Sequence, residues 1–393
     1  MKLLYVVNAF PKLSESFVIN EIKELHDRGH DVSVFAMSKS EEEIKHTELQ
    51  EMNITVYYKY KPSLQDFPDL ISKKILHPSV LRRALFIEEP LHHAYYLHLG
   101  RQIIEAIERE GGVDLIHGHF VTPNRFAVTY AAAYYNIPCT VTAHAHEIFS
   151  PPNLRRLKQV CSRFDHMIVP SEYNKQYLRK EIGIDTDMSV VPATTDVKKF
   201  EPSEGCISGR LLTIGRLVEK KGYKYSIDAV ANLIKRGYDV EYHIIGTGEQ
   251  KDSLIDRVKQ KGIEEHVEFL GHVPDDKLQE ELHEAELFIL PCIIASNGDR
   301  DVAPVALKEA MATKTACIST TISAIPELIT DGHDGLLVKP NNTPALTNAI
   351  TELLDNPDRR QELAANGRKT VQTQFDISNS VDDLVKVFSS IRK

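Results

Sequence analysis

The sequence lacks the features that mark disulfide-stapled, membrane-spanning and nucleic-acid-binding proteins. Its five cysteines lie far apart in 393 residues and form no C-x-x-C pair, which argues against a disulfide framework or a structural zinc site. The longest markedly apolar stretch, Leu287 to Ala295, is far short of the ~20 residues that a membrane span needs. Lys and Arg total 47 against 56 Asp and Glu, with no long basic run. This acidic balance argues against binding to duplex nucleic acid.

The first residues do not have the pattern of an export signal. The apolar run Leu3–Val7 is short, and Asn8 and Pro11 end it, so we interpret it as a buried strand. We therefore expect a soluble cytoplasmic protein and set aside a periplasmic binding protein. Residues 71–101 mix basic with aliphatic and aromatic side chains. They are interpreted either as two solvated amphipathic helices or as a peripheral contact with the inner face of the membrane.

The order of apolar patterns predicts an α/β fold. Leu3–Val7 is a continuous apolar run, as in a strand buried on both faces. Apolar residues then recur at helical spacing from Val18 to Leu25, Gly29 stands where a helix would end, and Val32–Phe35 begins the next strand. Strand, helix and strand in this order indicate a parallel sheet. Further strand-like runs lie at 115–116, 139–142, 167–169, 211–214, 242–245, 287–290 and 316–318.

A polar segment divides this series in two. Residues 193–209 carry Pro202, Gly205 and Gly209, a composition that suits a linker between two α/β lobes. We predict a first domain over 1–197 and a second over 198–375. Residues 376–393 carry apolar side chains at helical spacing, which predicts an amphipathic helix that packs on another element.

The segment LLTIGRLVEKKG, residues 211–222, is the first that indicates chemistry. An apolar strand runs into Gly215 and Arg216, and Lys221 follows five residues after the arginine. Two cations at the carboxyl end of a parallel strand would converge above the sheet, where a phosphate or diphosphate is the natural ligand. Taken alone, the pair could equally be two solvated charges.

A second segment that indicates chemistry is SNGDRDVAPVALKEAMA, residues 296–312. Pro304 suits the first residue of a helix, whose amino end offers unpaired N–H groups to an anion. Asp301 precedes this helix and Glu309 lies in its second turn. Eight residues at helical rise span ~12 Å, comparable with the reach from a hexose across a diphosphate to a ribose.

Together these two segments resemble glycosyltransferase family 4, a group of retaining nucleotide-sugar enzymes. The family's donor lobe carries a G-R-x-x-x-x-K-G element and a Glu-x7-Glu element, where this chain has GRLVEKKG and NGDRDVAPVALKEAMA. The resemblance continues through IIGTGEQKDSL at 244–254, VEFLGHVPDDKL at 267–278 and IPELITDGHDGLLVKPNN at 325–342. It implies the GT-B fold, in which two Rossmann-like lobes face a central cleft and a C-terminal helix returns to the first lobe.

The amino-terminal half resembles a subgroup that makes exopolysaccharides of the colanic-acid type. FPKLSESF at 10–17, HGHF at 117–120 and TAHAHEIF at 142–149 are similar to the F-P-x-L-S-E-T-F, H-A-H-F and T-A-H-x-x-D-I-F of that subgroup. In the family, the histidine at the position of His144 sits beside the transferred sugar. The two H-x-H pairs leave a zinc site as an alternative, because alternate residues of a strand share a face. The family's sites need no metal, and we expect none here.

The resemblance implies retaining transfer of a hexosyl unit from a nucleoside diphosphate sugar to a saccharide or lipid-linked acceptor, with UDP favoured as the nucleotide and GDP as its rival. No cofactor, metal or nucleic acid is expected. Catalytic roles fall to Arg216, Lys221, Asp301 and His144. Nucleotide-sugar contacts fall to Ser14, Gly215, Gly246, Gly248, Val273, Ala303, Pro304, Val305 and Glu309.

Three departures from the family pattern keep other functions open. Asp301 replaces the usual first glutamate, Val302 stands where the family has glycine, and Ser323-Ala324 replaces a Gly-Gly pair. The alternatives are a GT-B-fold nucleotide-sugar epimerase or hydrolase, and a non-catalytic nucleotide-sugar-binding subunit of a glycan synthase. A Rossmann dehydrogenase is rejected, because Gly246-Thr247-Gly248 lacks the third glycine of G-x-G-x-x-G.

Overall fold

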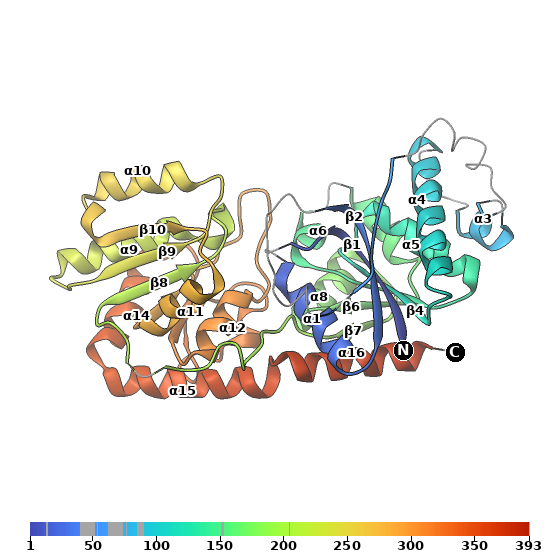
Figure 1. The fold of residues 1–393 in the computed structure, drawn as a ribbon. Coiled ribbons are helices and arrows are strands. Elements are labelled where there is room, and N and C mark those ends of the chain that lie inside the picture. The colour runs from blue at the N-terminus through green and yellow to red at the C-terminus, as the bar shows by residue number, and fades with distance from the viewer. Residues whose placement is uncertain are drawn as a thin grey trace. The chain divides into compact units, whose positions relative to one another are not determined.

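The chain folds into two compact units, each with its own core. The computed structural model describes residues 1–12, 15–39, 52, 54–61, 74–75, 77–84, 90–150, 153–203 and 205–392. Unit 1 comprises Met1–Pro192 together with Ser380–Lys393, and unit 2 comprises Ala193–Asn379 (Figure 1). Each unit contains one parallel sheet covered by helices, so the predicted α/β fold with two Rossmann-like lobes is confirmed.

Unit 1 is built on a seven-stranded sheet in the order β3-β2-β1-β4-β5-β6-β7. The central strand β1 is buried along Leu3–Val7, as its continuous apolar run predicts for a strand covered on both faces. The bounds are β1 Lys2–Phe10, β2 Asp31–Lys39, β3 Val56–Tyr58, β4 Leu115–His119, β5 Cys139–Thr142, β6 His166–Val169 and β7 Met188–Val190.

The helices of unit 1 include one that returns from the end of the chain. Helices α3 and α4 both pack against α5, which lies on β4. In the terminal helix α16 the ring of Phe388 is fully buried, 5.2 Å from the ring of His117. The bounds are α1 Ser16–Asp27, α3 Pro78–Ala84, α4 Pro90–Arg109, α5 Phe126–Tyr135, α6 Ala145–Phe149, α7 Leu154–Cys161, α8 Glu172–Tyr177 and α16 Ile377–Ile391.

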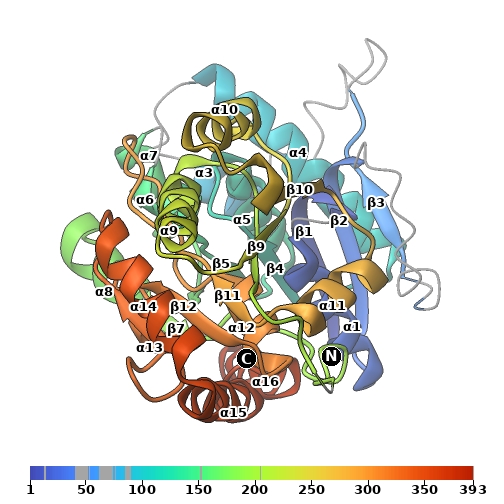
Figure 2. The same cartoon turned by 90° about the vertical axis from the view of Figure 1, so that its left-hand side faces the viewer.

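Unit 2 has a six-stranded parallel sheet in the order β10-β9-β8-β11-β12-β13. Successive residues of a strand point to opposite faces, so Leu211 and Leu212 of β8 enter two separate apolar cores. Helices α9, α10 and α14 cover the first core, α11, α12 and α13 cover the second, and α15 contributes to both. Accordingly, α10 and α11 lie on opposite sides of the sheet (Figures 1 and 2).

The strands of unit 2 are β8 Arg210–Ile214, β9 Glu241–Ile245, β10 Val267–Gly271, β11 Leu287–Ile289, β12 Ala316–Thr320 and β13 Leu336–Val338. Its helices are α9 Tyr223–Lys235, α10 Lys251–Lys261, α11 Asp275–Glu284, α12 Val305–Ala312, α13 Ile325–Leu328, α14 Thr343–Asp355 and α15 Pro357–Gln374.

The segment expected to link the two lobes is largely part of unit 2. Unit 2 begins at Ala193 rather than at residue 198. The reason is packing, because Val197 and Phe200 are buried in its second core. The Thr195 amide also donates to the carbonyl of Phe375, 3.1 Å away. The polar composition of 193–209 hid these two apolar anchors.

Residues 71–101, considered above for a membrane contact, lie partly outside the described residues. Within the described part, Lys74 pairs with Glu108 at 2.5 Å and Arg83 donates to the carbonyl of Arg163 at 2.6 Å. Lys74 lies in a turn and Arg83 on α3, and both cations are thus bonded to other parts of unit 1. Across the described residues, no helix combines the length and the apolar character that a membrane crossing needs.

Candidate functional site

The loop that follows β8 is held in place by the loop that follows β9. The amides of Gly215 and Leu217 donate to the carbonyls of Ile245 and Thr247, both at 2.9 Å. A Cβ at Gly246 would lie 2.0 Å from the carbonyl oxygen of Gly215, so only glycine allows the two backbones to approach this closely. The predicted Gly246 and Gly248 therefore have a clear packing role in shaping the loop that carries Arg216.

Four charged side chains form a buried ion cluster at the carboxyl end of β8. The Nζ atom of Lys221 lies 2.7 Å from one carboxylate oxygen of Asp301, and Nζ of Lys220 lies 3.3 Å from the other. Lys220 also contacts Asp299 at 3.2 Å. All four side chains are at most 16% exposed. The cluster ties the loop after β8 to the loop that precedes α12.

The cluster fixes the charge of its members. Burial alone would raise the pKa of the Asp301 carboxyl, but the ammonium groups of Lys221 and Lys220 outweigh burial and lower that pKa to about 2. Burial works to lower the pKa of Lys221, whereas the Asp301 carboxylate raises it, and the net shift is upward. Both groups are therefore charged at neutral pH. The guanidinium of Arg216 is exposed at the same loop.

Helix α12 presents its amino end beside this cluster. The helix begins at Val305, with Pro304 in the preceding, non-helical position, one residue later than we predicted. The ψ angle of 134° at Pro304 is extended and explains the difference. The buried Nζ of Lys308, whose pKa burial lowers to about 7, donates to the carbonyls of Ala303 and Ala193, at 3.2 Å for Ala303. Lys308 thus holds Ala303, which lies just before the first helical amides, in a fixed position.

Glu309 on α12 is a partly buried carboxylate. Burial raises its pKa to about 7, against smaller opposing effects of Lys199, Lys308 and Lys221. Within the described part of the chain, its side chain forms no hydrogen bond or ion pair. Glu309 belongs to α12, the helix that follows Asp301, and Asp301 is paired with Lys221. A ligand hydroxyl would satisfy the unpaired carboxylate.

Two further residues border this region. Val273 follows β10 and packs, half-buried, against the second core of unit 2. Ser323, one of the departures from the family pattern, adopts φ 48°, the left-handed region that favours glycine. Its buried Oγ has no partner among the described residues. Glycine, which has no Cβ, would be less strained at this position, in keeping with the Gly-Gly pair of the family pattern.

A second group of functional candidates lies in unit 1. His117 and His119 are on β4, and His144 immediately precedes α6. The rings of His119 and His144 are stacked, with centroids 5.5 Å apart, and Nδ1 of His119 lies 3.2 Å from Nε2 of His144. Burial and the nearby His119 hold the pKa of His144 well below its usual range. Ser14 lies outside the described residues.

Three residues of this group could in principle hold a metal ion. One ligand atom each from Glu21, His117 and His119 lie within 4.8 Å of one another. However, both ring nitrogens of His117 are already bonded to threonine hydroxyls, Nδ1 to Thr140 at 2.7 Å and Nε2 to Thr142 at 3.1 Å. Nε2 of His119 bonds to Glu21 at 3.2 Å. These bonds satisfy the nitrogens without a metal.

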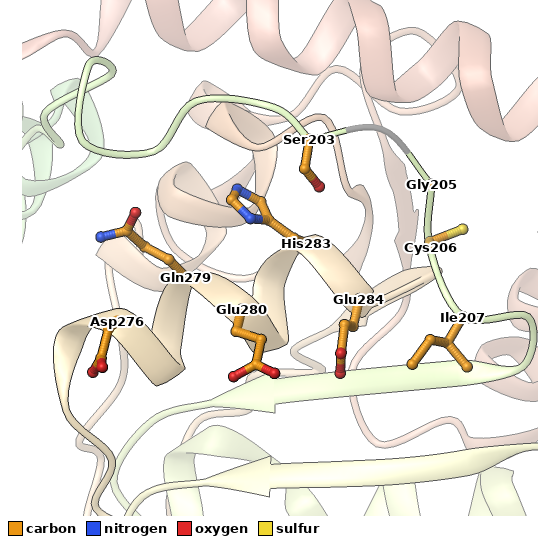
Figure 3. A pocket seen from close by; sticks show the side chains of 9 residues that line it. All are labelled: Ser203, Gly205, Cys206, Ile207, Asp276, Gln279, Glu280, His283 and Glu284. Carbon is orange, nitrogen blue, oxygen red and sulfur yellow. The ribbon is translucent and has the colours of Figure 1, made fainter.

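A cavity of about 680 Å³ lies elsewhere on unit 2. Figure 3 shows that α11 lines it with side chains such as His283, on the side of Ser203, and Glu284, on the side of Ile207 in the segment before β8. No predicted site residue lines it. The chemistry-bearing residues of unit 2 gather instead around the loops that follow β8 and precede α12.

Two family descriptions match this chain. "Glycosyltransferase Family 4" matches residues 14–199, and "Glycosyl transferases group 1" matches residues 208–370. The chain is a family 4 glycosyltransferase. This result confirms the resemblance drawn from the motifs, and the two matched segments correspond closely to units 1 and 2.

Several known proteins align with this glycosyltransferase over nearly its full length. AmsK of Erwinia amylovora, named as an amylovoran biosynthesis glycosyltransferase, is 26% identical over 95% of this chain and 96% of its own. WcaL of Escherichia coli, whose name refers to colanic acid biosynthesis, is 27% identical over the same shares. The Anabaena protein HepE, solved with UDP and glucose, superposes with a TM-score of 0.76 at 20% identity over 99% and 100% of the two chains. The likeness to HepE supports the GT-B fold.

Sequence reasoning missed several residues of the two sites. Lys220 carries two of the ion pairs, and its only signal was the doubled lysine of EKKG. Lys308 occupies a position that reads as helix interior, and nothing in the sequence marks its contacts. Glu21 lies on α1 at a position typical of a solvated helix face, yet its carboxylate contacts His119 and Tyr5.

Proposed function

We propose that this glycosyltransferase moves a hexosyl unit from a nucleoside diphosphate sugar to a saccharide or lipid-linked acceptor, with retention of the anomeric configuration and without a metal ion. The observation that carries the proposal is the site around α12. The ion pair of Lys221 and Asp301 lies before this helix, and Glu309 within the helix is partly buried and forms no hydrogen bond or ion pair with the described residues. Such an arrangement suits a ligand that carries both hydroxyl groups and a diphosphate.

The donor would lie along α12 in this proposal. Glu309 would accept hydrogen bonds from the ribose hydroxyls. Arg216, Lys221 and the amides at the start of α12 would stabilise the charge that grows on the leaving diphosphate. The leaving phosphate itself would take the proton of the acceptor hydroxyl, so that no pair of carboxylates of the hydrolase type is needed.

In this proposal, donor binding starts at the ion pair between Lys221 and Asp301. A diphosphate would compete with the Asp301 carboxylate for Lys221, because both anions use the same ammonium. Lys220, which contacts the other oxygen of Asp301, would keep that carboxylate in place. Asp301 would then be available to the 3- and 4-hydroxyls of the sugar, and His144 of unit 1 to a further sugar hydroxyl.

The relatives favour a role in exopolysaccharide synthesis. AmsK and WcaL are named for amylovoran and colanic acid biosynthesis, and we infer a comparable polymer for this chain. UDP is the favoured nucleotide, in keeping with the UDP bound to HepE, and GDP is its rival. A peripheral contact with the membrane through residues 71–101 stays part of the proposal for a lipid-linked acceptor.

The proposal is tested by a donor screen followed by a transfer assay. UDP, GDP, ADP and their sugars are compared for thermal stabilisation, since a ligand specific for the folded state raises the melting temperature. The stabilising donor is then incubated with and without saccharide and lipid-linked acceptors, and the product anomer is determined by NMR. An α-linked product from an α-donor supports retention. An inverted product or a C2 epimer formed from donor alone would contradict the proposal.

One observation favours a second function. Lys221, the predicted stabiliser of the leaving group, is already paired with Asp301, which would weaken its action on a phosphate. The chain would then bind the nucleotide sugar as a non-catalytic subunit of a glycan synthase. Stabilisation by a donor sugar without turnover on any acceptor would support this alternative.

A further inference from the structure

A chain of hydrogen bonds connects His144 to the interior of unit 1. Nε2 of His144 contacts Nδ1 of His119 at 3.2 Å, and Nε2 of His119 contacts an oxygen of Glu21 at 3.2 Å. The hydroxyl of Tyr5 donates to the same oxygen of Glu21 at 2.7 Å. His119 is 1% exposed and the Glu21 side chain 16%. Tyr5 lies on β1, His119 at the end of β4, His144 two residues after β5, and Glu21 on α1.

The contact with Glu21 determines which nitrogen of each imidazole carries the hydrogen. An ionised carboxylate can only accept hydrogen bonds, so Nε2 of His119 must carry a hydrogen. In the neutral imidazole, Nδ1 of His119 is then the acceptor, and the hydrogen between the two rings belongs to Nε2 of His144. By the same rule Nδ1 of His144 carries no hydrogen.

The start of α6 holds the main chain of His144 in place. The carboxylate of Glu147 accepts from the His144 amide at 2.7 Å and from the Val121 amide at 3.1 Å. These two bonds tie the residue that carries the imidazole to the loop that follows β4.

We propose that Glu21 and His119 are positioning residues that hold His144 as a neutral imidazole of one tautomer, with its hydrogen on Nε2 and an acceptor lone pair on Nδ1. The significance for the sugar rests on the proposed function. An acceptor nitrogen takes a hydrogen bond from a sugar hydroxyl and offers none to a phosphate oxygen. His144 would thus select for the hydroxyl-bearing part of the donor.

The packing around His144 agrees with one fixed orientation of its ring. Phe120 lies 4.5 Å and Phe17 5.0 Å from the ring of His144, measured between centroids. Tyr5 stacks on His119 at 5.7 Å. The aromatic neighbours restrict rotation of both imidazoles, and the low pKa of His144, caused mainly by burial, keeps the ring neutral at physiological pH.

The tautomer is measured directly by NMR of ¹⁵N-histidine-labelled protein, with the His144 signals assigned by their loss in His144→Gln. The wild type is expected to show a protonated Nε2 and a bare Nδ1 at His144. Glu21→Met and His119→Leu remove the acceptor at each step, and both are expected to give mixed tautomers. His119→Asn keeps an acceptor at the Nδ1 position and is expected to restore the wild-type signal. Glu24→Met, the same change elsewhere on α1, where Glu24 pairs with Arg28, is the matched control.

A protonated Nδ1 in the wild type, or an unchanged tautomer in both Glu21→Met and His119→Leu, would overturn the inference. Thermal melts of each variant establish that it is folded. In the transfer assay Glu21→Met is expected to lower kcat/KM about tenfold or more, with His119→Asn closer to wild type than His119→Leu. Because the NMR measurement needs no turnover, a wild type without transferase activity would count against the proposed function and leave the tautomer result to decide this inference.

Discussion

The candidate sites of the two units use opposite kinds of electrostatics. In unit 2, Lys221 and Asp301 remain charged although largely buried, because the two opposite charges lie 2.7 Å apart. In unit 1, His119 and His144 are joined by hydrogen bonds, and burial favours the neutral form of His144. The first arrangement suits a charged ligand and the second a ligand with hydroxyl groups. Within the proposed function, this difference is the reason for giving the diphosphate to unit 2 and one sugar hydroxyl to His144.

The largest expected effect comes from removing the cations of unit 2. Arg216→Ala and Lys221→Ala are each expected to lower turnover about a hundredfold to a thousandfold, because each removes a charge that would stabilise the leaving diphosphate. Steady-state kinetics with the identified donor measure the loss. Lys235→Ala, on the exposed face of α9, is the control. Rates near wild type in both site variants would refute the diphosphate assignment.

Asp301→Asn removes the carboxylate charge that pairs with Lys221 in the same cluster. We expect a loss of roughly 2 kcal/mol in transition-state stabilisation, since one preorganised contact to the sugar is removed. Affinity for bare UDP should stay the same or rise, because Lys221 loses its carboxylate partner. Transfer kinetics and calorimetric titration with UDP separate the two effects. A strong fall in UDP affinity would mean that Asp301 serves the nucleotide and not the sugar.

Glu309 gives the site a dependence on pH. Its pKa of about 7 is raised by burial, so the ionised carboxylate, the better acceptor for ribose hydroxyls, forms as pH rises from 6 to 8. We expect UDP affinity to increase over that range and to be about tenfold weaker in Glu309→Gln at pH 8. The variant, neutral at every pH, corrects for titration of the nucleotide. Parallel pH profiles in wild type and variant would remove Glu309 from ribose recognition.

The smallest expected effect is that of chelation. Since the ring nitrogens of His117 are bonded to Thr140 and Thr142, we expect exhaustive treatment with EDTA to leave most transfer activity intact. Activity is measured before and after dialysis against the chelator. Loss of turnover that a single divalent metal restores would make Glu21, His117 and His119 a metal site.

The sequence predicted the central strands better than the edges of the sheets. Runs such as 3–7 and 211–214 are buried on both faces and therefore continuously apolar. The edge strands β3 and β10 are only partly buried and mix polar with apolar residues, so their pattern does not stand out. Strand β4 extends through His117 and His119, and these polar residues concealed more than half of its length.

The candidate site was predictable as a set of residues but not as a network. Motif spacing led to Lys221, Asp301 and Glu309, because each belongs to a recurring element of the family. The ion pair between Lys221 and Asp301 joins residues eighty positions apart, and the contact from Glu21 to His119 joins residues 98 apart. Such pairings depend on the tertiary fold, which local periodicity does not encode.

The affinity for UDP of matched variants from the two units is the most direct test of the contrast between their sites. Calorimetric titration of UDP into wild type, Lys221→Ala, Glu309→Gln, His144→Ala and Glu21→Met compares two changes in unit 2 with two in unit 1. The account predicts that the unit 2 variants lose about tenfold or more in affinity, whereas the unit 1 variants bind UDP as wild type does. Equal losses in both pairs, or a loss confined to unit 1, would contradict the assignment of the nucleotide to the charged site of unit 2.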